Sequence, residues 1–284
     1  MNMCHNLSFG PNGGHEVKAR LSLILALIMF TFFPKSIGIT ADLKPIGGIT
    51  AFGGAERQRG QEASGIGGVD LLGLAPLGKD LGVQGGFYSS GGQGFRFGLN
   101  AGPVFNFTSG KAGLFLDYEH RAREDFNLVG IRGTGGYYFD QFDALLSYSQ
   151  PVSSVKRSGG RKFTGINELQ GILRFYPTNE VELNAGFLVN SFAGAGRKDE
   201  GGTGVGGIFG VSFKLFDPVV IQLVQVKVDN RERYRVTSGV QLIFGSPLKE
   251  WMHAHIPLPA AGGVPGGLKT SRRQLPPPPP PPST

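Results

Sequence analysis

The chain has 284 residues and a formal net charge of +7, with 47 Gly, 19 Pro and a single Cys. Gly at about one residue in six disfavours long helices, because each interior Gly costs a helix about 1 kcal/mol relative to Ala. The composition also excludes a disulfide scaffold and collagen, and 40% hydrophobic residues argue against wholesale disorder.

Most of the net positive charge comes from the two ends of the chain, 1–41 and 246–284. The basic isoelectric point of about 9.6 is therefore weak evidence for nucleic-acid binding, and we expect no nucleic-acid partner.

The first segment has the features of a secretory signal peptide. Lys18 and Arg20 precede an apolar run over 21–33, which is too short to span a bilayer comfortably. Small residues follow, so we predict a signal peptide over 1–41, with an extended basic region and cleavage after Ala41. The alternative is an uncleaved N-terminal anchor.

The region 42–245 alternates apolar and polar residues with a period of two, which is the signal of β-strands. In 95–107, for example, Phe95, Leu99 and Phe105 share one face, and Arg96 and Asn100 share the other. Twelve segments follow this pattern: 46–55, 63–74, 81–89, 94–107, 111–121, 126–139, 142–150, 163–176, 180–192, 204–216, 219–229 and 233–245. Segment 219–229 has an ambiguous face because nearly every position is apolar, and Pro103 predicts a bulge.

The connections and the strand lengths favour a membrane barrel over a soluble sandwich. Long or charged connections alternate with short turns, and the strands are long enough to cross a bilayer at a tilt. Aromatic residues also stand near both ends of the apolar faces, as interfacial anchors would. We therefore predict an all-β fold, a transmembrane antiparallel up-and-down β-barrel of about 12 strands with its apolar face towards lipid.

From the predicted signal peptide to Gly245 the chain resembles the bacterial outer-membrane β-barrel proteins. The last strand matches the C-terminal β-signal of that class at Thr237, Gly239, Leu242 and Phe244, although about forty residues follow it here. The resemblance implies location in the outer membrane and assembly by the barrel-assembly machinery, which reads this strand. Contact with outer-membrane lipid and lipopolysaccharide is implied as well.

Strand parity predicts which charged residues line the lumen. These are Arg96, Asp117, Glu119, Arg132, Asp143, Glu168, Arg174, Glu182, Lys214 and Arg235. Five are basic and five are acidic. They form either a salt-bridged filling that holds the barrel's shape or an opposed ladder of charges along a selective pore.

Two other groups of residues are candidates for function. Lys156, Arg157, Arg161 and Lys162 form a basic loop, which either binds lipopolysaccharide phosphates, attracts anionic solutes or is simply solvated. His120, near Glu119 and Asp117 in the sequence, is a candidate for catalysis. The spacing of residues along the chain identifies no partnering Ser or second acidic pair, so we assign no catalytic residue. We expect no cofactor and no metal site.

The segment 246–284 is rich in Pro and Gly and is predicted to be a disordered, largely polyproline II tail in the periplasm. It is interpreted as a spacer or as a ligand for a periplasmic partner. The function predicted overall is a small porin or channel for small solutes. The first alternative is a surface-binding or adhesin-type barrel that uses its basic loops, and the second is a lipid-modifying enzyme that uses His120.

Overall fold

A computed structural model describes residues 43–57, 62–92, 94–107, 109–122, 126–152, 157–158, 161–164, 166–192, 202–230, 233–243, 248–254 and 269–272. The predicted signal peptide over 1–41 and the terminal proline run lie outside the described residues.

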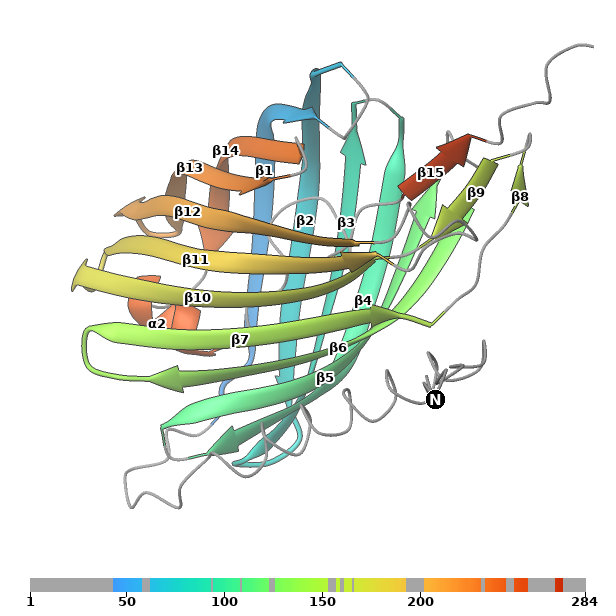
Figure 1. Ribbon diagram of the computed structural model, residues 1–284. Helices are drawn as coiled ribbons and strands as arrows, with labels where there is room; N and C mark the ends of the chain where they lie inside the picture. The colour runs from blue at the N-terminus through green and yellow to red at the C-terminus, as the bar shows by residue number, and fades with distance from the viewer. Residues whose placement is uncertain are drawn as a thin grey trace, which may run out of the picture. The chain divides into compact units, whose positions relative to one another are not determined.

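Twelve antiparallel strands close into a barrel, as predicted (Figure 1). Their bounds are β1 Ile46–Arg57, β2 Ser64–Pro76, β3 Leu81–Gly91, β4 Arg96–Phe107, β5 Gly110–Arg121, β6 Phe126–Tyr138, β7 Phe142–Pro151, β10 Ile166–Thr178, β11 Val181–Phe192, β12 Gly202–Phe216, β13 Val219–Asp229 and β14 Arg233–Ile243. Each strand pairs with its neighbours in the chain, and β14 closes the ring on β1, for example at Gly48↔Ile243. A separate small sheet contains β8 Arg157–Ser158, β9 Arg161–Thr164 and β15 Lys269–Arg272.

The connections divide between the two ends of the barrel. Turns of a few residues join β2 to β3, β4 to β5, β6 to β7, β10 to β11 and β12 to β13 at one end, here called the short-turn end. The other end, here called the long-connection end, carries among others the segment between β7 and β10. In outer-membrane barrels the short turns face the periplasm.

The barrel's outer surface is apolar and its inner surface is polar, which inverts the arrangement of a water-soluble protein. On β5, the Leu114 and Leu116 side chains are 55% and 58% exposed, whereas Asp117 and Glu119 are 2% and 0% exposed. This alternation confirms the prediction that the apolar faces point outward, because exposed rows of Leu and Phe are stable against lipid tails and not against water.

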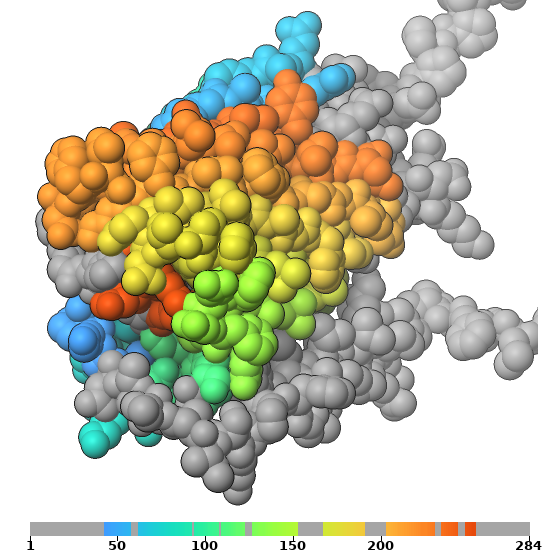
Figure 2. All heavy atoms as spheres, turned by 90° about the vertical axis from the view of Figure 1, so that its left-hand side faces the viewer, coloured from blue at the N-terminus to red at the C-terminus, as the bar shows by residue number. Residues whose placement is uncertain are grey.

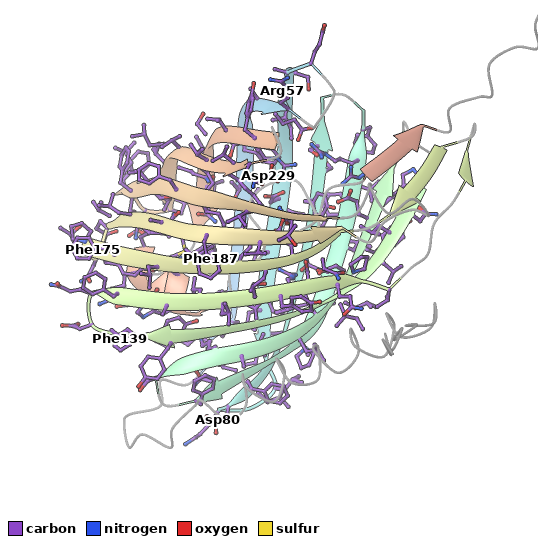
Figure 3. All side chains as sticks on the ribbon, viewed as in Figure 1. Arg57, Asp80, Phe139, Phe175, Phe187 and Asp229 are labelled. Atoms are coloured by element: carbon purple, nitrogen blue, oxygen red, sulfur yellow. The ribbon has the colours of Figure 1, made fainter. Side chains whose placement is uncertain are left out.

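Aromatic rings gather near both ends of this apolar belt. At the long-connection end, Phe97 contacts both Phe95 and Tyr118. At the short-turn end, Phe142 stacks on Phe175 with 4.8 Å between ring centroids, and Figure 3 shows Phe139 and Phe175 near that end. Such girdles are where aromatic side chains meet the membrane interfaces.

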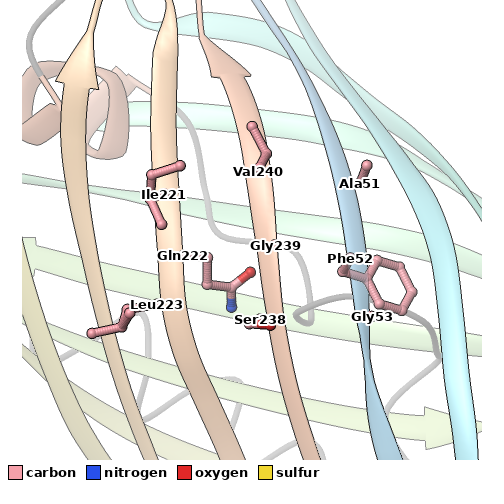
Figure 4. Close-up of a pocket in the computed structure, with 9 residues that line it drawn as sticks. All are labelled: Ala51, Phe52, Gly53, Ile221, Gln222, Leu223, Ser238, Gly239 and Val240. Carbon is pink, nitrogen blue, oxygen red and sulfur yellow. The ribbon is translucent and has the colours of Figure 1, made fainter.

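A β-bulge in β13 explains why its face could not be assigned from the sequence. Gln222 pairs with Gly239 but Gln225 pairs with Thr237, so one extra residue enters β13 between them. The side chain of Leu223 is 57% exposed there. The alternation of β13 therefore changes parity partway along the strand. A shallow pocket opens at this bulge across β13, β14 and β1 (Figure 4).

The predicted bulge at Pro103 is wrong. In the pairing of β4 with β5, Ala101 lies opposite Leu116 and Val104 lies opposite Gly113. The register is therefore the same on both sides of Pro103, and neither strand contains an extra residue there. The neighbouring Gly102 lies where β4 and β5 approach each other very closely. A Cβ on Gly102 would lie 1.9 Å from the Leu114 carbonyl oxygen, so the two backbones approach more closely than any side chain permits.

The expectation of extended backbone after residue 245 is wrong for α2, Leu248–Ala254. Its Leu248 and Trp251 side chains are buried with Val220 and Ile243 of the barrel wall. Apolar residues three apart lie on one helical face, and burying that face stabilises the helix despite the surrounding Pro and Gly. None of the helices in the described ranges is long and apolar enough to cross a membrane.

Candidate functional site: the charged lumen

The structure buries the predicted lumen residues on the barrel's inner face. Eight are buried almost completely: Arg96, Asp117, Glu119, Arg132, Asp143, Glu168, Arg174 and Glu182. The side chain of Lys214 is buried too, whereas that of Arg235 is 25% exposed.

Near the long-connection end, Glu56 joins two arginines of the lumen. Its carboxylate oxygens accept from Arg96 Nη2 at 2.6 Å and from Arg235 Nη2 at 3.0 Å. Arg96 Nε also donates to Ser90 Oγ at 2.9 Å. Glu56 was not predicted as a lumen residue because the first strand was expected to end at residue 55. Extending the alternation by one position would have found it.

The lumen charges of β5 are paired with residues of β3 and β6 and with each other. Arg132 donates to both carboxylate oxygens of Asp117, at 2.7 and 3.2 Å, and its guanidinium lies 4.9 Å from the Phe115 ring centroid. Glu119 accepts hydrogen bonds from the Tyr88 hydroxyl and from Arg121 Nε. A buried carboxylate is costly unless it is paired in this way.

A second group lies on β10, β11 and β13. Lys227 Nζ donates to Glu168 Oε1 at 2.6 Å, and Arg174 Nε lies 3.4 Å from Glu182 Oε1. Asn184 also donates to Glu182 at 2.9 Å. The sequence did not predict Lys227 as a lumen residue. Beyond the extra residue in β13, the odd-numbered residues face the lumen in place of the even-numbered ones.

These ion pairs run along the wall of the barrel. The Asp117–Arg132 pair joins the adjacent strands β5 and β6, and Arg174–Glu182 joins the adjacent β10 and β11. The Arg96–Glu56 pair joins β4 to β1, which is three places away around the ring. Opposite walls of a 12-stranded ring are six places apart, so each of these pairs stays on one side of the lumen.

The short-turn end differs, because α2 lies in the mouth of the barrel there (Figure 2). His253 Nε2 lies 2.7 Å from Asp143 Oδ1, and the Tyr176 hydroxyl donates to Asp143 Oδ2 at 2.7 Å. The His253 ring stacks on Tyr138 with 4.6 Å between centroids. Asp143 was predicted to line the lumen, but the tail residue that pairs with it was not foreseen.

His120 lies on the outer face of β5, whereas Asp117 and Glu119 point into the lumen. Its Nδ1 lies 2.8 Å from the side-chain oxygen of Asn127, and its ring contacts Phe97. Neither contact supplies a nucleophile or a carboxylate, so the geometry gives no support to the catalytic alternative. Among the described residues there is also no group of His, Cys, Asp and Glu suited to a metal ion.

The predicted basic loop is described in part. Lys156 lies outside the described residues, Arg157 belongs to β8, and Arg161 and Lys162 belong to β9. The backbone of β15 pairs with β9, with Arg272 opposite Arg161. Thus one tail segment pairs with the connection at the long-connection end, whereas α2 lies at the short-turn end, and the expectation of a wholly periplasmic tail does not account for both.

Three of the four residues of the predicted assembly signal are in β14. Thr237 and Gly239 pair within the barrel closure, opposite Gly54 and Phe52 of β1, and Leu242 lies opposite Ile49. Phe244 lies outside the described residues.

Together these features define a class of protein: a closed, transmembrane, antiparallel β-barrel of 12 strands with an apolar belt outside and charges inside. The solved structure of an outer-membrane channel from Pseudomonas putida F1 matches it with a TM-score of 0.55 at 11% identity, covering 74% of this chain and 99% of that one. The NanC porin matches with a TM-score of 0.51 at 7% identity, covering 68% of this chain and 98% of that one. At these identities the likeness establishes the fold. No protein-family model and no curated protein matches the chain.

Proposed function

We propose that the protein is an outer-membrane channel that passes small solutes through a lumen of mixed charge. The fold that it shares with solved outer-membrane channels supports this proposal. Its leader over 1–41 would direct export, and the strand carrying Thr237, Gly239, Leu242 and Phe244 would be read by the barrel-assembly machinery.

The observation that carries the proposal is the direction of the lumen ion pairs. A filling that only holds the barrel's shape gains most from pairs that tie opposite walls together. Here Asp117–Arg132 and Arg174–Glu182 join adjacent strands, so these pairs do not reach across the lumen. The side chains of Lys227 and Arg235 are 33% and 25% exposed, so the lumen offers charges to a passing solute.

Single-channel recording of the purified, folded protein in a planar bilayer tests the proposal. We expect discrete conductance steps from barrels in which α2 has left the mouth, and Lys227→Gln should lower their anion-to-cation permeability ratio because it removes a partly exposed lumen charge. Arg57→Gln is the matched control, since Arg57 is exposed on the opposite face of β1 from Glu56. If folded barrels give no steps even when α2 is displaced from the mouth, the protein is not a channel.

A second candidate function, surface binding through the basic loop, is supported by the register of the small sheet. Pairing with β15 places Arg272 opposite Arg161 in the backbone ladder, next to Lys162, while Lys269 lies opposite Thr164 at the other end of the ladder. A concentration of positive charge at the outer rim would suit lipopolysaccharide phosphates. Replacing Arg161 and Lys162 by Gln should reduce binding of the folded protein to lipopolysaccharide vesicles without changing conductance. Equal binding of the double variant and the parent would eliminate this role.

A further inference from the structure

At the short-turn end, one part of the inner wall is apolar, on β2, β13 and β14. Val220 and Ile243 are fully buried there, and Leu72 packs against them from β2. An open, water-filled mouth would leave these side chains wet, which is unfavourable in proportion to their apolar area. Their burial is achieved by Leu248 and Trp251 of α2, which cover them from inside the barrel.

The barrel wall is shaped to accept the indole of Trp251. A Cβ on Gly48 of β1 would lie only 2.8 Å from Trp251 Cζ2, so the ring occupies the space that a larger residue would fill. The Trp251 side chain is 2% exposed although it lies on a seven-residue helix outside the sheet. The chain holds no other Trp.

Polar contacts fix the other end of the helix. His253 is placed between a carboxylate and two aromatic rings: it pairs with Asp143, stacks on Tyr138 and meets the Tyr176 ring edge-on with 5.7 Å between centroids. Lys111 Nζ donates to the His253 carbonyl oxygen at 2.6 Å. Strands β5, β6, β7 and β10 thus hold α2 from one side of the mouth, while β1, β2, β13 and β14 hold it from the other.

We propose that α2 is an internal plug that closes the short-turn mouth, and that the channel opens when the helix leaves it. The plug rests on the channel function proposed above. It is attached to β14 by only residues 244–247, so it remains near the mouth when it is released. Release breaks one apolar cluster and a few polar contacts while the strand ladders of the barrel stay intact.

Displacing the plug from the wall side tests this proposal in the full chain. Gly48→Val puts methyl groups where the Trp251 ring lies, and should shift the balance from seated towards unseated α2 by about a hundredfold, the scale of losing one large buried side chain. Trp251 fluorescence should move to longer wavelength and become open to aqueous quenchers, because it is the sole Trp. Conductance in the same preparation should rise.

A second variant keeps the test decisive if Gly48→Val does not fold. Trp251→Ala leaves the wall intact and should raise conductance, and Glu250→Ala is the matched control because Glu250 is exposed on the same helix. The plug proposal fails, and the channel proposal stands, if fluorescence shows that Trp251 is displaced in Gly48→Val while this variant conducts, but no better than the parent. If the barrel conducts in no variant, the channel proposal itself fails.

Discussion

Asp117→Asn provides the most direct measure of how strongly the lumen charges are tied together. The substitution keeps the size of the side chain but removes the charge that Arg132 faces. Arg132 is 1% exposed and donates two hydrogen bonds to this carboxylate, so its guanidinium would stay buried with one neutral acceptor.

The structure sets the expected magnitude. Removing one partner of a buried ion pair typically costs 3–5 kcal/mol, because the remaining charge is left uncompensated. An Asn oxygen still accepts one hydrogen bond, so we expect a loss of about 3 kcal/mol, or more than a hundredfold in the folding equilibrium. Asp140→Asn is the control: that carboxylate lies 3.6 Å from Lys249 Nζ and its side chain is fully exposed, so the loss should be below about 1 kcal/mol.

Urea unfolding of the barrel in lipid vesicles, followed by circular dichroism at the β-sheet band, measures both losses. The double variant Asp117→Leu with Arg132→Met should recover most of the stability, since it removes both charges from the buried site. A cost for Asp117→Asn as small as that for Asp140→Asn would refute the reasoning, because it would mean that water screens the Asp117–Arg132 pair as it screens a surface pair.

Two further substitutions test the wall and the lipid belt. Gly102→Ala should destabilise the barrel by about 1–3 kcal/mol, because its Cβ would collide with the Leu114 carbonyl oxygen, whereas Gly133→Ala, with open space around it, should be nearly neutral in the same urea titration. Leu116→Arg should cost about 2–4 kcal/mol if the middle of β5 faces the bilayer centre, and Leu77→Arg in a short turn about 0–1 kcal/mol. Equal costs for the two arginines would contradict the membrane orientation.

The sequence predicted the barrel well because one physical rule governs most of it. Each strand separates lipid from lumen, so apolar and polar residues must alternate, and β5 shows the alternation from Leu116 to Glu119. The rule failed where the backbone departs from a regular strand: an extra residue in β13 shifted Lys227 to the face opposite the one that counting assigns.

Helix α2 was missed for a different reason. Composition averaged over 246–284 is dominated by Pro and Gly, which conceals a seven-residue segment with Leu248 and Trp251 on one helical face. The wall held a matching signal, since Val220 and Ile243 are apolar on the side that should be polar. Neither signal indicates a contact by itself, because the partners are far apart in the sequence.

The closure of the ring also orders events in time. The apolar part of the surface that receives α2 includes the first and the last strand of the barrel, with Gly48 on β1 and Ile243 on β14. This apolar part of the surface is complete only after the last strand has joined the first, so the Trp251 side of the helix is not fully covered while the chain is still being inserted. If α2 is the plug proposed above, we therefore expect it to reach its final position only after the ring has closed, so that each new barrel is unblocked before it is closed.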